Sequence, residues 1–536
     1  MLRITELKLP LDHPDAALRE AIIRRLGIDA ADLITFRLFR RSYDARKKHS
    51  EIQFIYTVDV EVRNEADLLR QLAEDRHVGP APDMRYRPEV HAPEGLRERP
   101  VIVGFGPAGI FAALILAQGG FRPIVLERGP EVRQRTRDTW GLWRNEILNP
   151  ESNVQFGEGG AGTFSDGKLY SQIKDPRHHG RKVLEEFVKA GAPEEILYSS
   201  KPHIGTFRLT GVVAHIREQI KALGGEVRFR NKVTDLLMED GHVRGVMLEG
   251  GEEIPSRHVI LALGHSARDT FRMLHARGVF MESKPFSVGF RIEHPQSLID
   301  KARLGKYAGH PKLGAADYKL VHHAGNGRSV YSFCMCPGGT VVAATSEPER
   351  VVTNGMSQYS RNERNANAGI VVGISPAQDY PGGPLAGIEF QEGLESLAYR
   401  LGGGNYHAPA QRVGDFLAGQ ASSALGSVEP SYTPGVTATD LAQALPDFAI
   451  QALREALPVF DRQIKGFAMG DAVLTGVETR TSAPLRITRG QDLQSLNLKG
   501  LYPAGEGAGY AGGILSSGVD GIRVAEAVAR DLVRPL

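Results

Sequence analysis

The chain has 536 residues, a formal net charge of +2 and two cysteines, and 41% of its residues are hydrophobic. The near-neutral charge excludes a chain-wide attraction to nucleic acid or to an anionic surface. Two cysteines are too few for a disulfide framework, so we expect a reducing compartment. The N-terminus lacks a secretory pattern and no run of about 18 apolar residues occurs, which predicts a cytoplasmic protein without a membrane span.

Residues 1–75 predict a small N-terminal α+β domain with the element order β-α-β-β-α. Asn64 precedes the second helix as its expected N-cap. Residues 76–99 carry several prolines and mixed charges, which is typical of a linker. A basic run of the small domain contains one acid, Asp44, and comprises Arg37, Arg40, Arg41, Arg46, Lys47 and Lys48. We interpret it as a solvated hairpin face, with contact to RNA as the less favoured alternative.

A dinucleotide-binding pattern opens the main body at VIVGFGPAGIFAALILAQ, which reads as a buried strand, a glycine-rich turn and an apolar helix. Gly104, Gly106 and Gly109 match the spacing G-x-G-x-x-G. In this pattern the first glycine allows a tight turn, the second lets the backbone approach a pyrophosphate, and the third lets the helix pack on the strand. The helix N-terminus then offers free N–H groups to the phosphates.

A second strand, PIVLE, ends in Glu127, close to the distance of about 20 residues at which an acid binds a ribose hydroxyl. This carboxylate disfavours the 2′-phosphate of NADP because of its charge, so NAD and FAD are the candidates at this point.

Later segments favour FAD. The strand HVILALG closes on Gly264 and resembles a motif of glutathione-reductase-type flavoproteins, with Leu263 where those proteins have Thr. The segment KGLYPAGEGAGYAGGILSSGVDG resembles their terminal motif, with Glu506 in place of Asp. The resemblance implies that Glu506 reaches the ribityl or pyrophosphate part of FAD, and that the helix after Gly513 points its N-terminus at the flavin ring.

The chain as a whole resembles the uncharacterised bacterial FAD-dependent dehydrogenases that carry a small N-terminal α+β domain. The motifs are GFGPAGIFAAL, NVQFGEGGAGTFSDGKL, SFCMCPGG, GVETRTSAPLRI and YPAGEGAGYAGGILSSGVDG. The resemblance implies an α/β fold with a Rossmann-like, glutathione-reductase-type FAD domain at 98–280 and 481–536, and an inserted α+β substrate domain at 281–480. The cofactor-binding residues expected from motif and resemblance are Gly104, Gly106, Pro107, Ala108, Gly109, Glu127, Arg128, Gly159, Gly160, Lys168, Val233, Gly264, Gly505, Glu506, Gly513 and Ile514.

The reaction partner is less defined, because no second strand-G-x-G-x-x-G-helix pattern occurs. Electrons come either from a small-molecule substrate or from NAD(P)H bound without that pattern, and pass to the flavin. The candidate catalytic residues are His265, Cys334, Cys336, Glu478 and Arg480.

Each candidate catalytic residue could instead have a purely structural role. Cys334 and Cys336 form C-x-C, which is either a redox dithiol or two buried small residues. Glu478 and Arg480 either hold an anionic substrate or form a structural ion pair. His265 either approaches the cofactor or is a loop histidine. The histidine pairs at 178–179 and 322–323 lack ligand spacing, so no metal site is expected.

Three functions follow from this sequence. The favoured one is a FAD-dependent oxidoreductase that transfers hydride between a small organic substrate or nicotinamide and the flavin. The alternatives are an RNA- or partner-binding flavoprotein in which FAD is structural or a redox sensor, and a dithiol reductase that uses Cys334 and Cys336.

Overall fold

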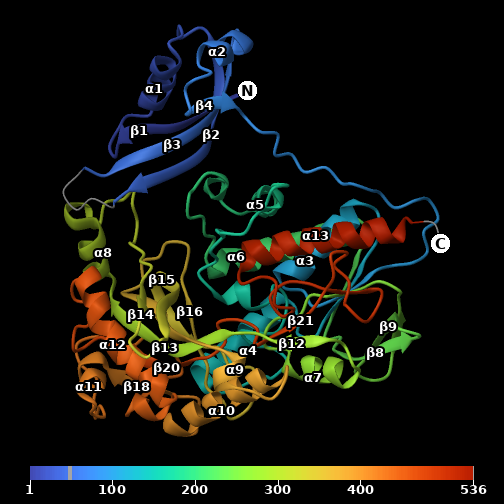
Figure 1. The fold of residues 1–536 in the computed structure, drawn as a ribbon, viewed down its shortest axis with the longest axis vertical. Helices are drawn as coiled ribbons and strands as arrows, with labels where there is room; N and C mark the ends of the chain where they lie inside the picture. Colours follow the sequence, from blue (N-terminus) through green and yellow to red (C-terminus); the bar gives the residue numbers. More distant parts are fainter. Residues whose placement is uncertain (46–50, 535–536) are drawn as a thin grey trace.

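The computed structural model describes residues 1–45 and 51–534, and its largest sheets have four, five and eight strands (Figure 1). Helices and strands alternate through most of the chain, which confirms the predicted mixed α/β class. Figure 1 shows the four-stranded sheet at one end of the molecule, apart from the other sheets. Within the described ranges, no helix combines the length and apolarity needed to span a membrane.

The N-terminal unit has the predicted order β-α-β-β-α, followed by one more strand. Its elements are β1 (Leu2–Pro10), α1 (Ala16–Leu26), β2 (Leu33–Asp44), β3 (Gln53–Val62), α2 (Glu65–Gln71) and β4 (Val78–Pro80). The sheet order is β2-β3-β1-β4 and all its pairs are antiparallel. β4 pairs with β1 and lies in the stretch 76–99 that the sequence predicts as a linker. Asn64 precedes α2 as expected, but its side chain makes no capping hydrogen bond.

Part of the basic run of the N-terminal unit makes internal contacts. The Arg37 guanidinium pairs with the buried Asp59 at 3.2 Å. The backbone N–H of Arg41 donates to the carbonyl of Tyr198 in the main body, and the Arg41 guanidinium lies over the Tyr198 ring. Arg46, Lys47 and Lys48 lie outside the described residues.

The second sheet is parallel throughout, with the order β22-β11-β5-β6-β7. Its strands are β5 (Val101–Val103), β6 (Ile124–Glu127), β7 (Glu226–Phe229), β11 (Val259–Leu261) and β22 (Leu501–Pro503). The three central strands are apolar runs, except that β6 ends in Glu127, as expected for strands buried on both faces. The last strand joins the sheet from a segment more than 200 residues after its neighbour β11, so the sheet is assembled from both ends of the main body.

Two helices pack against each other on one side of this sheet, α3 (Pro107–Gln118) and α13 (Ile514–Leu532) (Figure 1). Both are largely buried, which explains why α3 is apolar or small on every face, whereas α13 also carries charged residues such as Asp520 and Glu526. Other helices of the main body before residue 280 are α4 (Val132–Asn145), α5 (His179–Lys189), α6 (Thr206–Ala222) and α7 (Arg268–Ala276). A three-stranded sheet comprises β8 (Val233–Glu239), β9 (His242–Leu248) and β10 (Glu253–Pro255).

The largest sheet has the order β14-β15-β17-β13-β20-β18-β19, with β16 paired to β15. Its strands are β13 (Phe286–Pro295), β14 (Val321–His323), β15 (Ser329–Ala343), β16 (Thr353–Met356), β17 (Asn365–Ile374), β18 (Ala408–Arg412), β19 (Val436–Ala438) and β20 (Val473–Glu478). Beside it lie α8 (Gln296–Leu304), α9 (Pro376–Asp379), α10 (Ala386–Leu401), α11 (Val413–Ala418) and α12 (Asp447–Gln463). A short ladder joins β12 (Met281–Ser283) to β21 (Leu485–Ile487).

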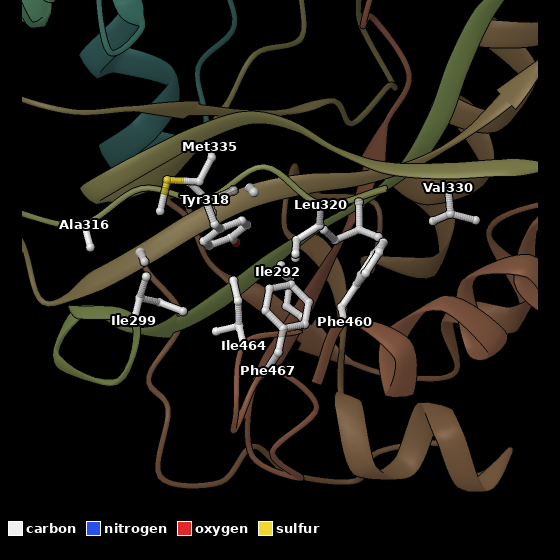
Figure 2. Close-up of a cluster of buried hydrophobic side chains, with 14 of the residues drawn as sticks. Ile292, Ile299, Ala316, Tyr318, Leu320, Val330, Met335, Phe460, Ile464 and Phe467 are labelled. Carbon is white, nitrogen blue, oxygen red and sulfur yellow. The ribbon is translucent and has the colours of Figure 1, made fainter. Parts of the chain in front are cut away.

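A dense apolar cluster holds the largest sheet against α12 (Figure 2). Ile292 of β13 and Phe460 of α12 are fully buried, and Figure 2 shows them beside Tyr318 and Phe467. The rings of Phe460 and Phe467 meet edge to face, with centroids 5.8 Å apart. Because protein interiors are closely packed, this cluster limits the movement of the sheet that carries Cys334 and Glu478.

Two glycine substitutions test the packing of α13 on α3. A Cβ at Gly521 would lie 2.2 Å from the carbonyl oxygen of Ala108, whereas a Cβ at Gly211 of α6 would meet nothing within 4 Å. We expect Gly521→Ala to lower the free energy of unfolding by about 1–3 kcal/mol, because the helices cannot both keep their places. Gly211→Ala should raise it by about 0.5–1 kcal/mol, because alanine favours the helix. Urea unfolding measures both, and effects of the same sign would contradict this packing.

Candidate active site

A cavity of about 720 Å³ lies where the parallel sheet meets the largest sheet. Its wall includes Val103 and Glu127, at the carboxyl ends of β5 and β6, and residues 262–267 after β11. The opposite wall includes Cys334 of β15 and Glu478 of β20. Open parallel sheets bind their ligands beyond the carboxyl ends of the strands, which is where this cavity lies.

The first glycine-rich turn has the geometry that its sequence predicts. Gly104 has a φ of +102°, and a Cβ there would lie 2.5 Å from the carbonyl oxygen of Ala262. A Cβ at Gly109 would lie 2.0 Å from the carbonyl oxygen of Gly104, so only glycine lets α3 pack on the turn. Gly106, Pro107 and Ala108 line the cavity, and α3 begins at Pro107. The free N–H groups of the first helical turn therefore lie at the cavity wall, suited to a phosphate.

The Glu127 carboxylate joins three glycine-rich segments beneath the cavity. It is 5% exposed and accepts hydrogen bonds from the backbone N–H groups of Phe105, Gly129 and Gly157, at 2.9, 2.9 and 3.0 Å. A carboxylate has about four acceptor positions, so capacity remains for a ligand hydroxyl. The side chain also lines the cavity, which is the position expected for a ribose contact.

The second glycine-rich loop touches the first. A Cβ at Gly160 would lie 2.9 Å from the Cα of Gly106, so the two backbones approach as only glycines allow. Gly159 has a φ of +88°, and a Cβ there would meet the Thr163 hydroxyl at 2.1 Å. The fully buried Arg135 guanidinium ties the loop down by donating to four of its carbonyl groups. The acceptors are the backbone oxygens of Asn153, Val154, Gly157 and Glu158, at 2.7–3.3 Å.

The far end of the cavity from the large sheet is lined by Arg128, Lys232 and Val233. The Arg128 guanidinium lies over the Phe156 ring and pairs with the carboxylates of Glu151 and Asp269. These ion pairs hold the pKa of Arg128 above its usual range despite its burial. The region offers a flat, partly apolar slot with a fixed cation beside it, which suits an adenine ring.

The C-terminal segment closes the cavity from a third side. Glu506, Gly513 and Ile514 line it, and α13 begins at Ile514 with its N-terminus at the wall. The Asp520 carboxylate holds this segment in place, because it accepts from the Gly505 N–H at 2.8 Å and pairs with the Arg489 guanidinium. Burial raises the pKa of Glu506 to about 7. A carboxyl that is protonated near neutral pH can donate to a phosphate or ribityl oxygen.

The end of the cavity at the largest sheet is lined by ionisable side chains and by the thiol of Cys334. Lys168 and Cys334 both line it, and the Lys168 ammonium donates to the carbonyl of Met335. The fully buried Arg291 guanidinium lies behind them, donating at 2.9 Å to the Cys334 carbonyl and pairing with both oxygens of Glu478. Glu478 is thus neutralised by a structural partner, although it lines the cavity.

Arg480 and His265 lie in a polar network beside the cavity. The Arg480 guanidinium pairs with Glu395 at 2.8 Å and donates to the hydroxyls of Ser266 and Ser346. Glu395 is fully buried and also pairs with Arg268 at 2.7 Å. The Arg480 guanidinium is thus held by side chains of the protein while it also lines the cavity. Burial, together with Arg480 and Arg268, lowers the pKa of His265 to about 3, so its imidazole is neutral at neutral pH.

Most of the residues expected from the sequence meet at this one cavity. Those in its wall are Gly104, Gly106, Pro107, Ala108, Glu127, Arg128, Gly160, Lys168, Val233, Gly264, His265, Cys334, Glu478, Arg480, Glu506, Gly513 and Ile514. Four other expected residues do not line the cavity but lie close to residues that do. They are Gly109, Gly159, Gly505 and Cys336. Sequence reasoning missed three residues that hold the wall in place through partners outside their own elements. They are Arg135, which donates to backbone carbonyls, Arg291, which pairs with Glu478, and Asp520, which pairs with Arg489.

Comparison with known proteins gives two family matches. Residues 285–481 match the family described as "FAD-dependent protein, C-terminal domain-like", and residues 1–61 match a domain of unknown function, DUF8436. A curated relative, an uncharacterized protein of Clostridium beijerinckii, is 50% identical over 527 residues, which covers 98% of each chain.

Solved structures are similar to this chain at low identity and low TM-score. Glycine oxidase from Bacillus cereus is 10% identical with a TM-score of 0.35, and the match covers 81% of this chain and 97% of that one. L-proline dehydrogenase from P. horikoshii is 14% identical with a TM-score of 0.34, covering 83% and 95%. Similarities at these TM-scores carry no argument about this chain.

The family match over residues 285–481 identifies a FAD-dependent protein. The chain belongs to the same family as the Clostridium beijerinckii protein. Its cofactor is FAD.

The network around Glu395 gives a stability prediction. Glu395→Gln leaves the buried guanidinium groups of Arg268 and Arg480 short of a charge partner, so we expect the free energy of unfolding to fall by about 3–5 kcal/mol. The control Glu239→Gln breaks an exposed pair with Arg244 and should change it by less than about 0.5 kcal/mol. Chemical denaturation of both variants measures the difference, and equal losses would contradict a structural role for the buried network.

Proposed function

We propose that the chain is a dehydrogenase with a glutathione-reductase-type FAD domain at 98–280 and 481–536 and a substrate domain at 281–480, joined by a linker to the N-terminal domain. The observation that carries this proposal is the continuity of one cavity, from the glycine-rich turn and Glu127 to the N-terminus of α13 and the large sheet. FAD is a long molecule whose parts need these different surroundings in this order.

The residues of the wall would hold FAD in three sections. Glu127, Arg128 and Val233 would take the adenosine end, by a carboxylate for the ribose and a flat slot for the adenine. The start of α3 with Gly106 and Gly160 would take the pyrophosphate, because free N–H groups and the helix dipole stabilise negative charge. Glu506, Gly513 and Ile514 would take the ribityl chain and the near side of the flavin.

Bound FAD supplies the two-electron chemistry, and the chain supplies position and electrostatics. The N-terminus of α13 would stabilise negative charge on the pyrimidine side of the ring. The wall made by Lys168, Cys334 and Glu478 would face the reacting side of the ring and a small organic substrate. NAD(P)H is the other proposed electron donor, entering without a second glycine-rich motif of its own.

The alternative function, an RNA- or partner-binding flavoprotein, has weaker support. Two arginines of the basic run, Arg37 and Arg41, are engaged with Asp59 and Tyr198, so this face is partly used inside the molecule. Nucleic acid is therefore not among the proposed partners, and the cytoplasmic location stays a prediction.

Absorption spectroscopy tests the proposed function. The purified chain should show a flavin band near about 450 nm, and anaerobic addition of the electron donor should bleach it. Bleaching by NADH or NADPH identifies nicotinamide as the donor, whereas a band that survives both directs the search to small organic reductants. Purified chain that neither contains flavin nor takes it up from added FAD would contradict the proposal.

Substitution of Glu127 tests the mode of binding. Glu127→Gln replaces a charged acceptor of three backbone hydrogen bonds, so FAD affinity should fall roughly 10- to 100-fold, the equivalent of about 1.5–3 kcal/mol. The matched control is Glu131→Gln, four residues along the chain on an exposed side chain, which should leave affinity unchanged. Fluorescence titration with FAD measures both dissociation constants. Equal affinities for the two variants would show that Glu127 is not part of the site.

A further inference from the structure

Cys334 and Cys336 lie at a break in the regular structure of β15. The pairing of β15 with β17 shifts register between Phe333 and Cys336, and Cys334 has a left-handed backbone with a φ of +43°. Cys334 is partly exposed and lines the cavity, whereas Cys336 is fully buried behind it. The Cys336 thiol donates to the Cys334 carbonyl at 3.3 Å, which places the buried sulfur directly beside the exposed residue.

The charges around the two sulfurs favour an asymmetric pair. The Cys336 S–H group, with Lys168 and Arg291, holds the pKa of Cys334 well below the ordinary cysteine value. The same interaction raises the pKa of Cys336 well above that value. Asp166 opposes the effect on Cys334, and Glu478 and Glu506 also interact with its charge, but the two cations and the thiol prevail. Of the two sulfurs, the one at the cavity therefore loses its proton more readily, although its own burial opposes this, and the buried sulfur behind it holds its proton more strongly.

We propose that Cys334 and Cys336 form an oxidant-responsive dithiol, in which hydrogen peroxide oxidises Cys334 and Cys336 then closes a disulfide. This site rests on the chain's own side chains and does not depend on the proposed function. A nucleophilic thiolate open to a cavity, with a second thiol in contact behind it, is the arrangement that reversible cysteine oxidation requires.

The chemistry proceeds in two balanced steps. The Cys334 thiolate attacks one oxygen of peroxide, an S–O bond forms, the O–O bond breaks and hydroxide leaves, so that sulfur is oxidised to a sulfenic acid and peroxide is reduced. The Cys336 sulfur then gives up its proton and attacks the Cys334 sulfur. An S–S bond forms, the S–O bond breaks, and the hydroxyl group leaves with that proton as water. The disulfide would change the cavity wall at Cys334, which lines the cavity together with Lys168.

Peroxide titration of the full chain with its bound FAD tests the proposal, read by mass spectrometry of the peptide that spans 332–339. We expect loss of two hydrogens from this peptide, at a rate roughly tenfold or more above free cysteine at pH 7, because free cysteine is only a few per cent thiolate there. Cys336→Ser should instead accumulate a sulfenic acid that dimedone traps. Cys334→Ser should leave Cys336 unmodified, since that sulfur is buried.

The pH dependence separates a reactive thiolate from two merely buried residues. Alkylation of Cys334 by iodoacetamide should have a midpoint below about 8.5, the ordinary value for cysteine. Lys168→Met should move this midpoint upward, because it removes a cation beside the sulfur. An ordinary midpoint, or peroxide-treated protein in which both thiols stay reduced or form only disulfides between chains, would overturn the proposal.

Discussion

The candidate site depends on one buried carboxylate. Glu127 accepts backbone hydrogen bonds from the turn after β5, from its own strand end and from the second glycine-rich loop. These segments are otherwise short of side chains, because glycine is required wherever their backbones approach each other. A glycine-rich loop has few side chains that could fix its conformation. The Glu127 carboxylate fixes it instead, through charge-assisted hydrogen bonds from the backbone N–H groups. The shape of the cavity floor follows from these three bonds.

A second constraint is the junction between the parallel sheet and the largest sheet. Buried ion pairs fix it, because Glu395 of α10 lies between Arg268 of α7 and Arg480 after β20. Breaking such pairs is costly, so they hold the two walls of the cavity in a defined relation. The chain thereby brings Lys168 and Cys334 to the end of the cavity where the flavin ring is proposed to lie. The N-terminal unit contacts the main body at the backbone bridge between Arg41 and Tyr198, and none of its described residues lies in the cavity wall.

Local patterns in the sequence predicted the parts of the fold that local physics controls. The strand, glycine turn and helix at 101–118 were predictable because Gly104 and Gly109 occupy positions of the G-x-G-x-x-G pattern where any side chain would clash with the backbone. The N-terminal β-α-β-β-α order was predictable from apolar periodicity. The strand β4 was missed, because three residues with a proline carry no periodic signal and pair only through tertiary contact with β1. The roles of Arg135, Arg291 and Asp520 were also hidden, since their partners are brought close only by the folded chain. Arg480 looked catalytic from its position, and its partner Glu395, 85 residues earlier in the chain, could not be identified from spacing alone.

The central claim is that a single FAD molecule lies along this cavity with its adenosine end at Glu127 and its ring at the large sheet. A crystal structure of the chain grown with FAD tests it most directly. We expect a ribose hydroxyl on the Glu127 carboxylate, the pyrophosphate at the start of α3, and the flavin ring between the N-terminus of α13 and Cys334. FAD bound in the reverse direction, or outside this cavity, would contradict it.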